Sequence, residues 1–532
     1  MVSQARIEAL YSVFSCLFQV DNLPKSLKKH NFGKLSIRKT CQNRIFFVIL
    51  ASYFKGMLME KLIGRKQEQA KLQACMESGR SELVVVYGRR RIGKTFLVRR
   101  FFKDNYAFSF VGKHEMGREM QLSEFAKALQ QYSRSAFVPV FKSWTEAFDA
   151  LQKYLETCRQ KGKKVVFFDE MPWMDTPKSD FVMALENFWN GWANMRDDIL
   201  FVACGSATSW MVDKLLHNQG GLFNRITQKI YLRPFNLNET EQYLDEKHFG
   251  WNHYQIAQCY MILGGVPFYL TLLNPKLSLL SNIDELFFAD AHAMLRTEYN
   301  ELYSTLFKRP ENYLAVIKLL TERKEGFTRK EVSDKTKLGG AALTKILTDL
   351  EQCDFILPYA RYGNAKNNTI YRIKDFYTLF YYKYVNGVDA KDPRRWTHLS
   401  STPQVASWQG FSFELLCLLH LEEMKKALGI DRILNDASAW RSKQTDRNTQ
   451  IDLVIERADR NINLCEMKFS SGMYAIDKDY EQKLRERMSI FQAETKTRCS
   501  TRITMVTTYG VLQNKHSGIV NDEVVLDDLF ES

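Results

Sequence analysis

Residues 83–102, LVVVYGRRRIGKTFLVRRFF, decide the fold of the first half of this 532-residue chain. Residues 83–87 are a continuous apolar run of β-forming residues, as expected of a strand buried on both faces of a parallel sheet. Residues 88–95 then match the pattern GxxxxGK[ST], and a helix is predicted over residues 95–102. Strand, glycine loop and helix in this order predict a phosphate-binding loop, although a chance glycine-rich turn is the alternative.

The chemistry of this loop follows from its residue types. Its glycines let the backbone curl until the N–H groups face a phosphate. Lys94 is expected to reach the β- and γ-phosphates of ATP, and Thr95 to ligate Mg²⁺. The predicted nucleotide contacts are Gly88, Arg89, Arg90, Arg91, Ile92, Gly93, Lys94 and Thr95.

A second apolar strand, residues 165–168, ends in Asp169-Glu170. This is the Walker B arrangement, in which Asp169 holds Mg²⁺ through water and Glu170 polarises the attacking water. A pair of acids after a strand is often only a solvated strand end. The phosphate-binding loop upstream favours the catalytic interpretation.

Two further residues have a catalytic and a simpler interpretation. A third strand, residues 199–204, leads to Ser206, which either senses the γ-phosphate or belongs to an ordinary turn. Arg225 stands before a β-like stretch at 230–232 and is either a surface residue or an arginine finger. A finger acting in trans would require a homo-oligomer.

The strands and the helices between them, such as residues 181–192, predict a parallel α/β sheet covered on both faces. Residues 236–300 have a helical pattern and predict a small lid. The motif LGGVPFYL at 263–270 is expected to interrupt it, because glycine and proline break helices.

These motifs together resemble a known family. LIGRKQEQAKL, GRRRIGKT, FFDEMPW, CGSATSWM, LFNRITQKIYLRPF and GGVPFYL are similar to the AAA-related, archaeal-type ATPases of prokaryotes, over about residues 60–290. The resemblance implies a P-loop core, a helical lid, a winged helix and a C-terminal nuclease-like domain. It also implies nucleotide contacts at Gly88, Gly93, Lys94 and Thr95, with Mg²⁺ and water activation at Asp169 and Glu170. Many relatives have a second serine where this chain has Ala207, so the sensor role falls to Ser206.

Residues 326–373 carry a winged helix-turn-helix pattern. Thr328 and Glu331 fit a capping box that opens a helix. Residues 341–352 form an amphipathic helix with one apolar stripe, and residues 355–359 and 369–373 are expected to be the wing strands. The aromatic segment 376–385 is expected to be a core helix. The residues of the stripe are Leu343, Ile346, Leu347 and Leu350.

If this module binds DNA, residues 341–352 enter the major groove with Thr344 and Lys345 exposed. Arg361, Lys366 and Asn367 on the wing would contact the phosphate backbone. The alternative is packing or coupling to the ATPase core, because the helix has a single basic residue and two acids.

Residues 450–470, QIDLVIERADRNINLCEMKFS, predict a hairpin. A turn at 458–460 places Asp452 opposite Glu466, with Lys468 on the same face. Two opposed carboxylates repel, so they need a cation or a protonated partner. The other face is expected to be buried and holds Ile451, Leu453, Ile455, Cys465, Met467 and Phe469.

The hairpin resembles the D…ExK motif of the PD-(D/E)xK phosphodiesterase superfamily. Asp452 and Glu466 would then bind Mg²⁺ or Mn²⁺, and Lys468 would orient or deprotonate the attacking water. Glu414 on an upstream helix could complete the metal site, and residues 438–443 would be the strand between them. The alternative is a nuclease fold whose site is inactive or structural.

The amino-acid composition limits which partners and which cell compartment are expected. The net charge is +14, and half of it comes from residues 1–56, which hold nine Lys and Arg against two Asp and Glu. The apolar run at 44–54 is shorter than the ~20 residues that span a bilayer, so no stable membrane insertion is expected. We expect Met57 or Met59 to be the natural start; a secreted or membrane protein is the alternative. Ten scattered cysteines favour reduced thiols in the cytoplasm.

The expected organisation is an extension over 1–56, an ATPase core over 57–235, a lid over 236–305, a winged helix over 306–390 and a nuclease-like domain over 405–532. The expected function is Mg²⁺-dependent ATP hydrolysis coupled to a C-terminal domain that binds or cuts nucleic acid, with DNA as the partner. The alternative is a nucleotide-regulated scaffold or switch whose nuclease-like domain is inactive.

Overall fold

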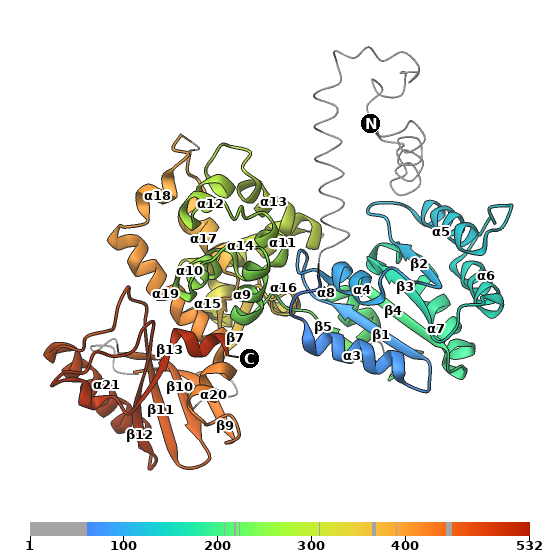
Figure 1. Cartoon of the computed structure of the whole chain (residues 1–532). Helices are drawn as coiled ribbons and strands as arrows, with labels where there is room; N and C mark the ends of the chain where they lie inside the picture. The colour runs from blue at the N-terminus through green and yellow to red at the C-terminus, as the bar shows by residue number, and fades with distance from the viewer. Residues whose placement is uncertain are drawn as a thin grey trace, which may run out of the picture. The chain divides into compact units, whose positions relative to one another are not determined.

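The first sheet of the computed structural model has five strands in the order β2–β3–β4–β1–β5 (Figure 1). All its pairings are parallel. The predicted strands lie at the centre and at one edge, and the parallel α/β fold is confirmed. The other edge strand, β2, was not predicted. The strands are β1 Glu82–Tyr87, β2 Phe108–Val111, β3 Lys164–Asp169, β4 Ile199–Gly205 and β5 Gln228–Tyr231.

Helices cover both faces of this sheet, so every residue of β3 and β4 is buried. Leu83 and Val85 pack on one face, and Val84 and Val86 on the other. This alternation buries the whole strand, as its continuous apolar sequence predicts. One face is covered by α5 Arg118–Ser133, α6 Trp144–Thr157 and α7 Phe181–Gly191, and the other by α3 Lys66–Glu77 and α4 Lys94–Phe102.

The following segment is helical, as predicted. Asn236 and Asn252 open its first two helices with complete capping boxes. Gly264 and Gly265 have φ of +69° and +64°, and a Cβ on Gly265 would lie 2.2 Å from the carbonyl oxygen of Phe235. The predicted break at this motif is therefore confirmed. The helices are α9 Leu237–Glu246, α10 His253–Leu263, α11 Pro267–Thr271, α12 Leu279–Phe287 and α13 Met294–Leu306.

A small antiparallel sheet in the order β6–β8–β7 follows, together with three helices. The capping box of Thr328 and Glu331 is present, and the predicted apolar stripe of the third helix is buried. The aromatic segment that follows is buried, as predicted. The elements are α14 Pro310–Thr321, β6 Phe327–Thr328, α15 Arg329–Thr336, α16 Gly340–Gln352, β7 Ile356–Tyr359, β8 Ile370–Ile373, α17 Phe376–Phe380 and η6 Tyr381–Val385.

The last sheet has the order β13–β12–β11–β10–β9. Its first three strands along the chain are antiparallel neighbours, whereas β11, β12 and β13 pair in parallel. The helix α21 joins β11 to β12. The elements are α18 Arg395–Leu399, α19 Pro403–Leu419, α20 Leu421–Ala427, β9 Asn435–Arg441, β10 Gln450–Arg457, β11 Asn461–Lys468, α21 Lys478–Thr495, β12 Ser500–Thr507 and β13 Asp522–Val525.

The backbone after β7 continues along the edge of this sheet. The Ala439 N–H donates to Ala360 O at 3.0 Å, and the Tyr362 N–H donates to Ala439 O at 2.8 Å. The Tyr359 hydroxyl donates to the carbonyl oxygen of Asp452 at 2.9 Å. The segment that holds the predicted wing is thus bonded to β9 and β10.

The structure describes residues 61–206, 208–216, 220–222, 224–307, 309–363, 369–389, 391–442 and 449–531, and residues 62–532 form one compact unit. Four subjects of the predictions lie outside these ranges: the extension over residues 1–56, and the single residues Ala207, Lys366 and Asn367.

In the described part, no helix is both long and apolar enough to cross a membrane. The eight cysteines found there are free thiols. The short helical turns are η3 Met171–Trp173, η4 Ala193–Met195, α8 Thr208–Trp210, η5 Met211–Leu216, η8 Ser517–Ile519 and η9 Leu526–Phe530.

Candidate functional site

The loop between β1 and α4 has the backbone shape that its glycines predict. Gly88 has φ +142°, and a Cβ there would lie 2.2 Å from the carbonyl oxygen of Leu232. Gly93 has φ +84° and Arg91 has φ +73°. Glycine adopts positive φ angles at little cost, so Gly88 and Gly93 suit the turn, whereas Arg91 adopts its angle at a cost in strain.

The two reactive residues of the motif lie at the start of α4. Lys94 is buried, and its Nζ donates to the carbonyl oxygen of Arg89 at 2.8 Å. Burial lowers the pKa of Lys94. Thr95 Oγ1 donates to Asp169 Oδ2 at 2.8 Å. The hydroxyl and the carboxylate predicted to hold Mg²⁺ are therefore in direct contact.

Asp169 and Glu170 stand at the end of β3. Burial raises the pKa of Asp169, and the neighbouring charge of Glu170 raises it further. Glu170 has φ +46°, and its Oε2 accepts a hydrogen bond of 2.8 Å from Ser206 Oγ. Ser206 follows β4, which is the next strand of the sheet. The strand ends thus bring the predicted sensor and the predicted water-activating acid together.

Two arginines of the loop form ion pairs with carboxylates far along the chain. Arg89 Nη1 donates to Asp375 Oδ1 at 2.6 Å, and both side chains are buried. Arg91 donates to the two carboxylate oxygens of Glu298 at 3.0 and 2.9 Å. The predicted nucleotide contacts of Arg89 and Arg91 stay predictions.

The other predicted residues of this region occupy varied positions. Ile92 is buried, and its carbonyl oxygen accepts a hydrogen bond from Arg65. Arg90 is half-buried. Arg225 is exposed in the turn before β5. An exposed arginine can reach a second molecule, but the structure gives it no catalytic contact within the described chain.

The predicted recognition helix α16 contacts the ATPase core. Lys345 Nζ lies 3.7 Å from Asp213 in η5 and 3.4 Å from Asp349. The Tyr231 hydroxyl of β5 donates to Gln352 O at 2.9 Å. Thr344 is exposed but accepts a hydrogen bond from Arg329. These contacts favour the interpretation of this module as a coupling element.

The hairpin of β10 and β11 has the predicted register, with Leu453 opposite Cys465, so Asp452 and Glu466 are the next facing positions. Ile451 departs from the prediction. It packs with Trp440 and Val454, not with the cluster that holds Leu453. The pairing with β9 shifts register between Ile451 and Val454, which turns this side chain to the other face.

The Glu466 carboxylate is already bonded to protein groups. It accepts hydrogen bonds from Lys468 Nζ at 2.9 Å, the Tyr480 hydroxyl at 2.7 Å and Arg487 Nη1 at 2.5 Å. Burial alone would raise the pKa of Glu466, but the charges of Lys468 and Arg487 outweigh it and lower the pKa. Arg487 and Tyr480 on α21 were not recognised in the sequence.

Glu414 lies on α19, and Lys324 Nζ approaches its two carboxylate oxygens to 3.5 and 3.4 Å. Burial and then the charge of Asp452 raise the pKa of Glu414 to about 7. Two of the predicted carboxylates are therefore close enough to repel each other.

The predicted metal set of Glu414, Asp452 and Glu466 is not assembled. Across the described ranges, no three His, Cys, Asp or Glu side chains gather as a metal site requires. The physical reason is that Glu466 is held by Lys468 and Arg487, so these residues do not fit a divalent cation in this arrangement.

A polar hollow of about 500 Å³ borders this cluster. Arg487 lines the hollow and bonds Glu466, and Gln450 lines it and lies 3.5 Å from Asp452 Oδ1. Its four basic side chains outnumber its two acidic ones. The lining residues are Arg323, Glu325, Arg441, Thr449, Gln450, Lys483, Glu486 and Arg487.

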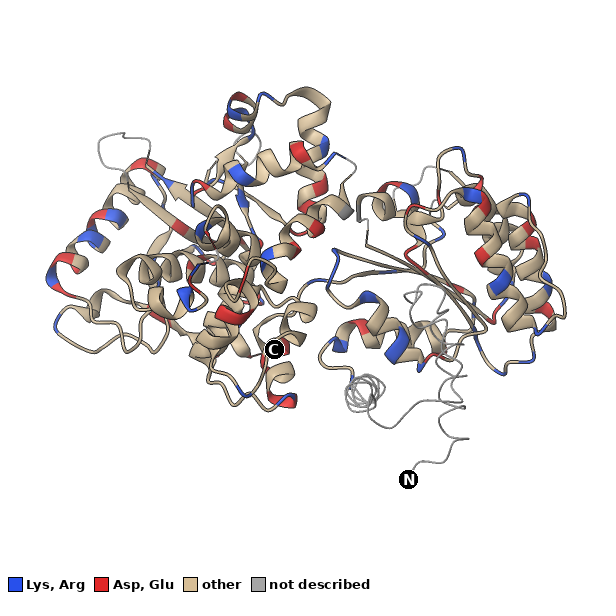
Figure 2. Ribbon diagram, turned by 90° about the horizontal axis from the view of Figure 1, so that it is seen from above, with Lys and Arg blue, Asp and Glu red and all other residues tan. Residues whose placement is uncertain are grey.

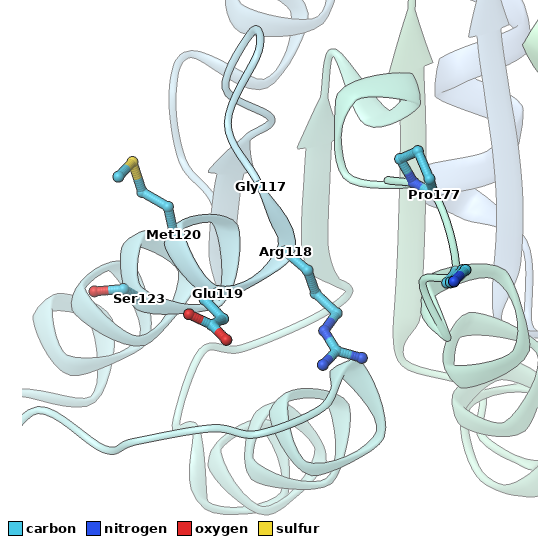
Figure 3. A pocket seen from close by; sticks show the side chains of 7 residues that line it. Gly117, Arg118, Glu119, Met120, Ser123 and Pro177 are labelled. Atoms are coloured by element: carbon cyan, nitrogen blue, oxygen red, sulfur yellow. The ribbon is translucent and has the colours of Figure 1, made fainter.

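A second hollow, of about 850 Å³, lies at the start of α5, between Arg118, Met120 and Pro177 (Figure 3). None of the predicted site residues lines it. Elsewhere, basic and acidic residues alternate along the exposed helices, α21 among them (Figure 2). Charge alone therefore does not mark a binding face.

Comparison with known proteins identifies the first half. Residues 62–273 match the model of an ATPase domain found predominantly in Archaea. An uncharacterized protein of Methanocaldococcus jannaschii is 22% identical over 327 residues, which are 61% of this chain and 68% of that protein. This part of the chain therefore matches an archaeal-type ATPase domain, as the sequence predicted.

Two solved structures are similar. The Walker-type ATPase of Pyrococcus abyssi is 18% identical with a TM-score of 0.45, covering 61% of this chain and 97% of that one. The ORC2 protein of Aeropyrum pernix is 13% identical with a TM-score of 0.37, covering 65% and 98%.

Proposed function

We propose that this protein hydrolyses ATP with Mg²⁺ at the β1–α4 loop and couples the nucleotide state to nucleic-acid binding by its C-terminal half. The observation that carries the proposal is the contact of Thr95 with Asp169 beside Lys94, with Glu170 paired to Ser206. These are the residue types that a P-loop ATPase uses to bind Mg²⁺ and ATP, and their contacts support the proposal.

Each residue of the β1–α4 site would have its own role in ATP hydrolysis. Thr95 and Asp169 would hold the metal, which neutralises phosphate charge when bound. The Lys94 ammonium would exchange the Arg89 carbonyl for phosphate oxygens. Glu170 would accept a hydrogen bond from the attacking water, with Ser206 fixing the carboxylate. Arg225 is proposed to act on a neighbouring copy, in a homo-oligomer.

The proposal of nucleic-acid binding is supported by the polar hollow beside Glu466. Phosphate backbones are bound mainly by Arg and Lys, and four such side chains line the hollow, of which Arg487 is bonded to Glu466 and Arg323 to Glu331. We propose the domain limits given above: core 57–235, lid 236–305, winged helix 306–390 and nuclease-like domain 405–532. The order α19, β9, β10, β11, α21, β12 supports the last of these.

A second candidate is a nucleotide-regulated switch whose nuclease-like domain does not cut. It is favoured by the bonds that Glu466 makes to Lys468, Tyr480 and Arg487, because they occupy the oxygens that a metal would need. Metal-dependent cleavage, with Mg²⁺ or Mn²⁺ at Asp452 and Glu466, requires these bonds to open.

One experiment separates the two candidates. The full chain is incubated with supercoiled, linear and single-stranded DNA, with Mg²⁺ or Mn²⁺ and with or without ATP, beside Asp452→Ala. Cleavage that is lost in the variant supports a nuclease. DNA binding without cleavage agrees with the proposed coupling and indicates a nuclease-like domain that does not cut. Neither binding nor cleavage contradicts the nucleic-acid proposal.

A further inference from the structure

A buried ion pair joins the phosphate-binding loop to a residue 286 positions later. Arg89 Nη1 lies 2.6 Å from Asp375 Oδ1, and the side chains are only 1% and 2% exposed. A buried pair of this kind is costly to desolvate, so it is retained only with good geometry.

Asp375 is itself held firmly. It is the N-cap of α17, where its Oδ2 accepts hydrogen bonds from the Thr378 N–H at 2.9 Å and the Thr378 hydroxyl at 2.6 Å. Tyr303 on α13 is bonded to the same Thr378 hydroxyl at 2.8 Å. Oδ2 of Asp375 therefore caps helix α17, and Oδ1 bonds Arg89 of the phosphate-binding loop.

Arg89 depends on this carboxylate for its position. Its Nε and Nη2 are buried and make no hydrogen bond within the described chain. The guanidinium also lies 4.9 Å from the ring centre of Phe355, an interaction that tolerates sliding. Asp375 is thus the group that gives this guanidinium a fixed direction.

The backbone of Arg89 connects the pair to the reactive lysine. The carbonyl oxygen of Arg89 accepts the hydrogen bond from Lys94 Nζ. A shift of the Arg89 side chain would move this carbonyl and change the shape of the loop between Gly88 and Gly93.

We infer that Asp375 is a positioning residue for the phosphate-binding loop. Its buried side chain acts through Arg89, which it anchors so that the loop is already shaped for phosphate. The inference rests on the proposed ATP hydrolysis. It also places a determinant of ATP affinity in the middle module, so a movement of α17 would change the ATPase site.

Asp375→Asn tests this role, because asparagine keeps the helix cap but removes the charge. The ATP affinity of the full chain, measured by titration calorimetry with Mg²⁺, is expected to weaken about tenfold or more, and KM to rise more than kcat falls. Asp477→Asn, the same change at the N-cap of α21, is the matched control and should leave the ATP affinity unchanged.

A double-mutant cycle with Arg89→Met separates positioning from stability. The double variant Arg89→Met/Asp375→Asn leaves no unpaired buried charge, so it is expected to fold even if a single variant does not. If Asp375 acts through Arg89, the double variant binds ATP no worse than either single variant.

Three results would overturn the inference. The first is an ATP affinity of Asp375→Asn equal to that of the wild type, and the second is additive effects of the two changes in the cycle. The third is a double variant that folds and binds ATP like the wild type. A wild-type chain that does not hydrolyse ATP contradicts the proposed function itself, which is a separate failure.

Discussion

Ser206 Oγ donates to Glu170 Oε2 at 2.8 Å, and this bond joins the ends of two strands, β4 and β3, that are neighbours in the sheet. Glu170 has a left-handed backbone conformation, and Ser206 gives its carboxylate a hydrogen-bond partner. Adjacent strand ends are where open parallel sheets place their reactive groups.

Glu170→Gln removes the group proposed to polarise water and keeps its size. We expect ATP binding to persist while kcat falls by about 10²–10⁴-fold, the usual effect of losing a general base. Titration calorimetry and a phosphate-release assay measure the two quantities. Glu156→Gln on the exposed side of α6 is the control, and a loss of ATP binding in Glu170→Gln would place this residue in a structural role instead.

Ser206→Ala tests the partner of Glu170. A hydrogen bond to a charged group contributes about 1.5–3 kcal/mol, so we expect kcat to fall by roughly 10–100-fold with little change in KM. Ser133→Ala on α5 is the control. Unchanged kcat would mean that the serine belongs to an ordinary turn.

Glu414 predicts a specific pH dependence of stability. Its pKa is raised to about 7 from the ordinary value of 4.5, so the folded state binds the extra proton between these values. Stability contributed by this group is therefore present below about pH 4.5 and lost as the pH rises to about 7. The loss amounts to at most about 3 kcal/mol.

Glu414→Gln should remove this loss. The free energy of unfolding of both proteins is measured by denaturant unfolding at pH 5 and pH 8, with EDTA present. Between pH 5 and pH 8, the wild type should lose more of this free energy than Glu414→Gln does. Lys324→Met should enlarge the effect, because Lys324 lowers the pKa of Glu414. Parallel pH curves for wild type and Glu414→Gln would show that Glu414 titrates normally.

If the polar hollow beside Glu466 binds phosphate, substituting one of its basic residues should lower the affinity for DNA. Lys483→Ala should weaken binding to DNA of any sequence and reduce the salt slope of log Kd by about one. Lys478→Ala, an exposed lysine on the same helix α21, is the matched control. Equal effects of the two substitutions would argue against the hollow as the phosphate site.

Local sequence patterns predicted the parts whose interactions are short in range. The loop glycines, the Thr328–Glu331 capping box and the register of the β10–β11 hairpin depend on residues within a few positions or on one turn. Each follows from backbone geometry that a sequence shows directly.

The contacts that the sequence could not predict are those that tertiary packing decides. Nothing near Arg89 in the sequence indicates its partner Asp375, which lies 286 positions later. Arg487 and Tyr480 come from a helix that folds back on the hairpin, and both bond the Glu466 carboxylate. The register shift beside Ile451 depends on the pairing with β9, which the sequence of the β10–β11 hairpin does not show.

The most direct test of the central claim is the affinity of the full-length protein for DNA, measured in fluorescence anisotropy without nucleotide, with ADP and with ATP in Glu170→Gln to prevent turnover. Coupling predicts a Kd that differs between the ATP and ADP states by about 5–150-fold, the range of ordinary allosteric coupling, and a difference that vanishes in Lys94→Ala. The same Kd in all three states, in a protein that binds both ligands, would contradict the account.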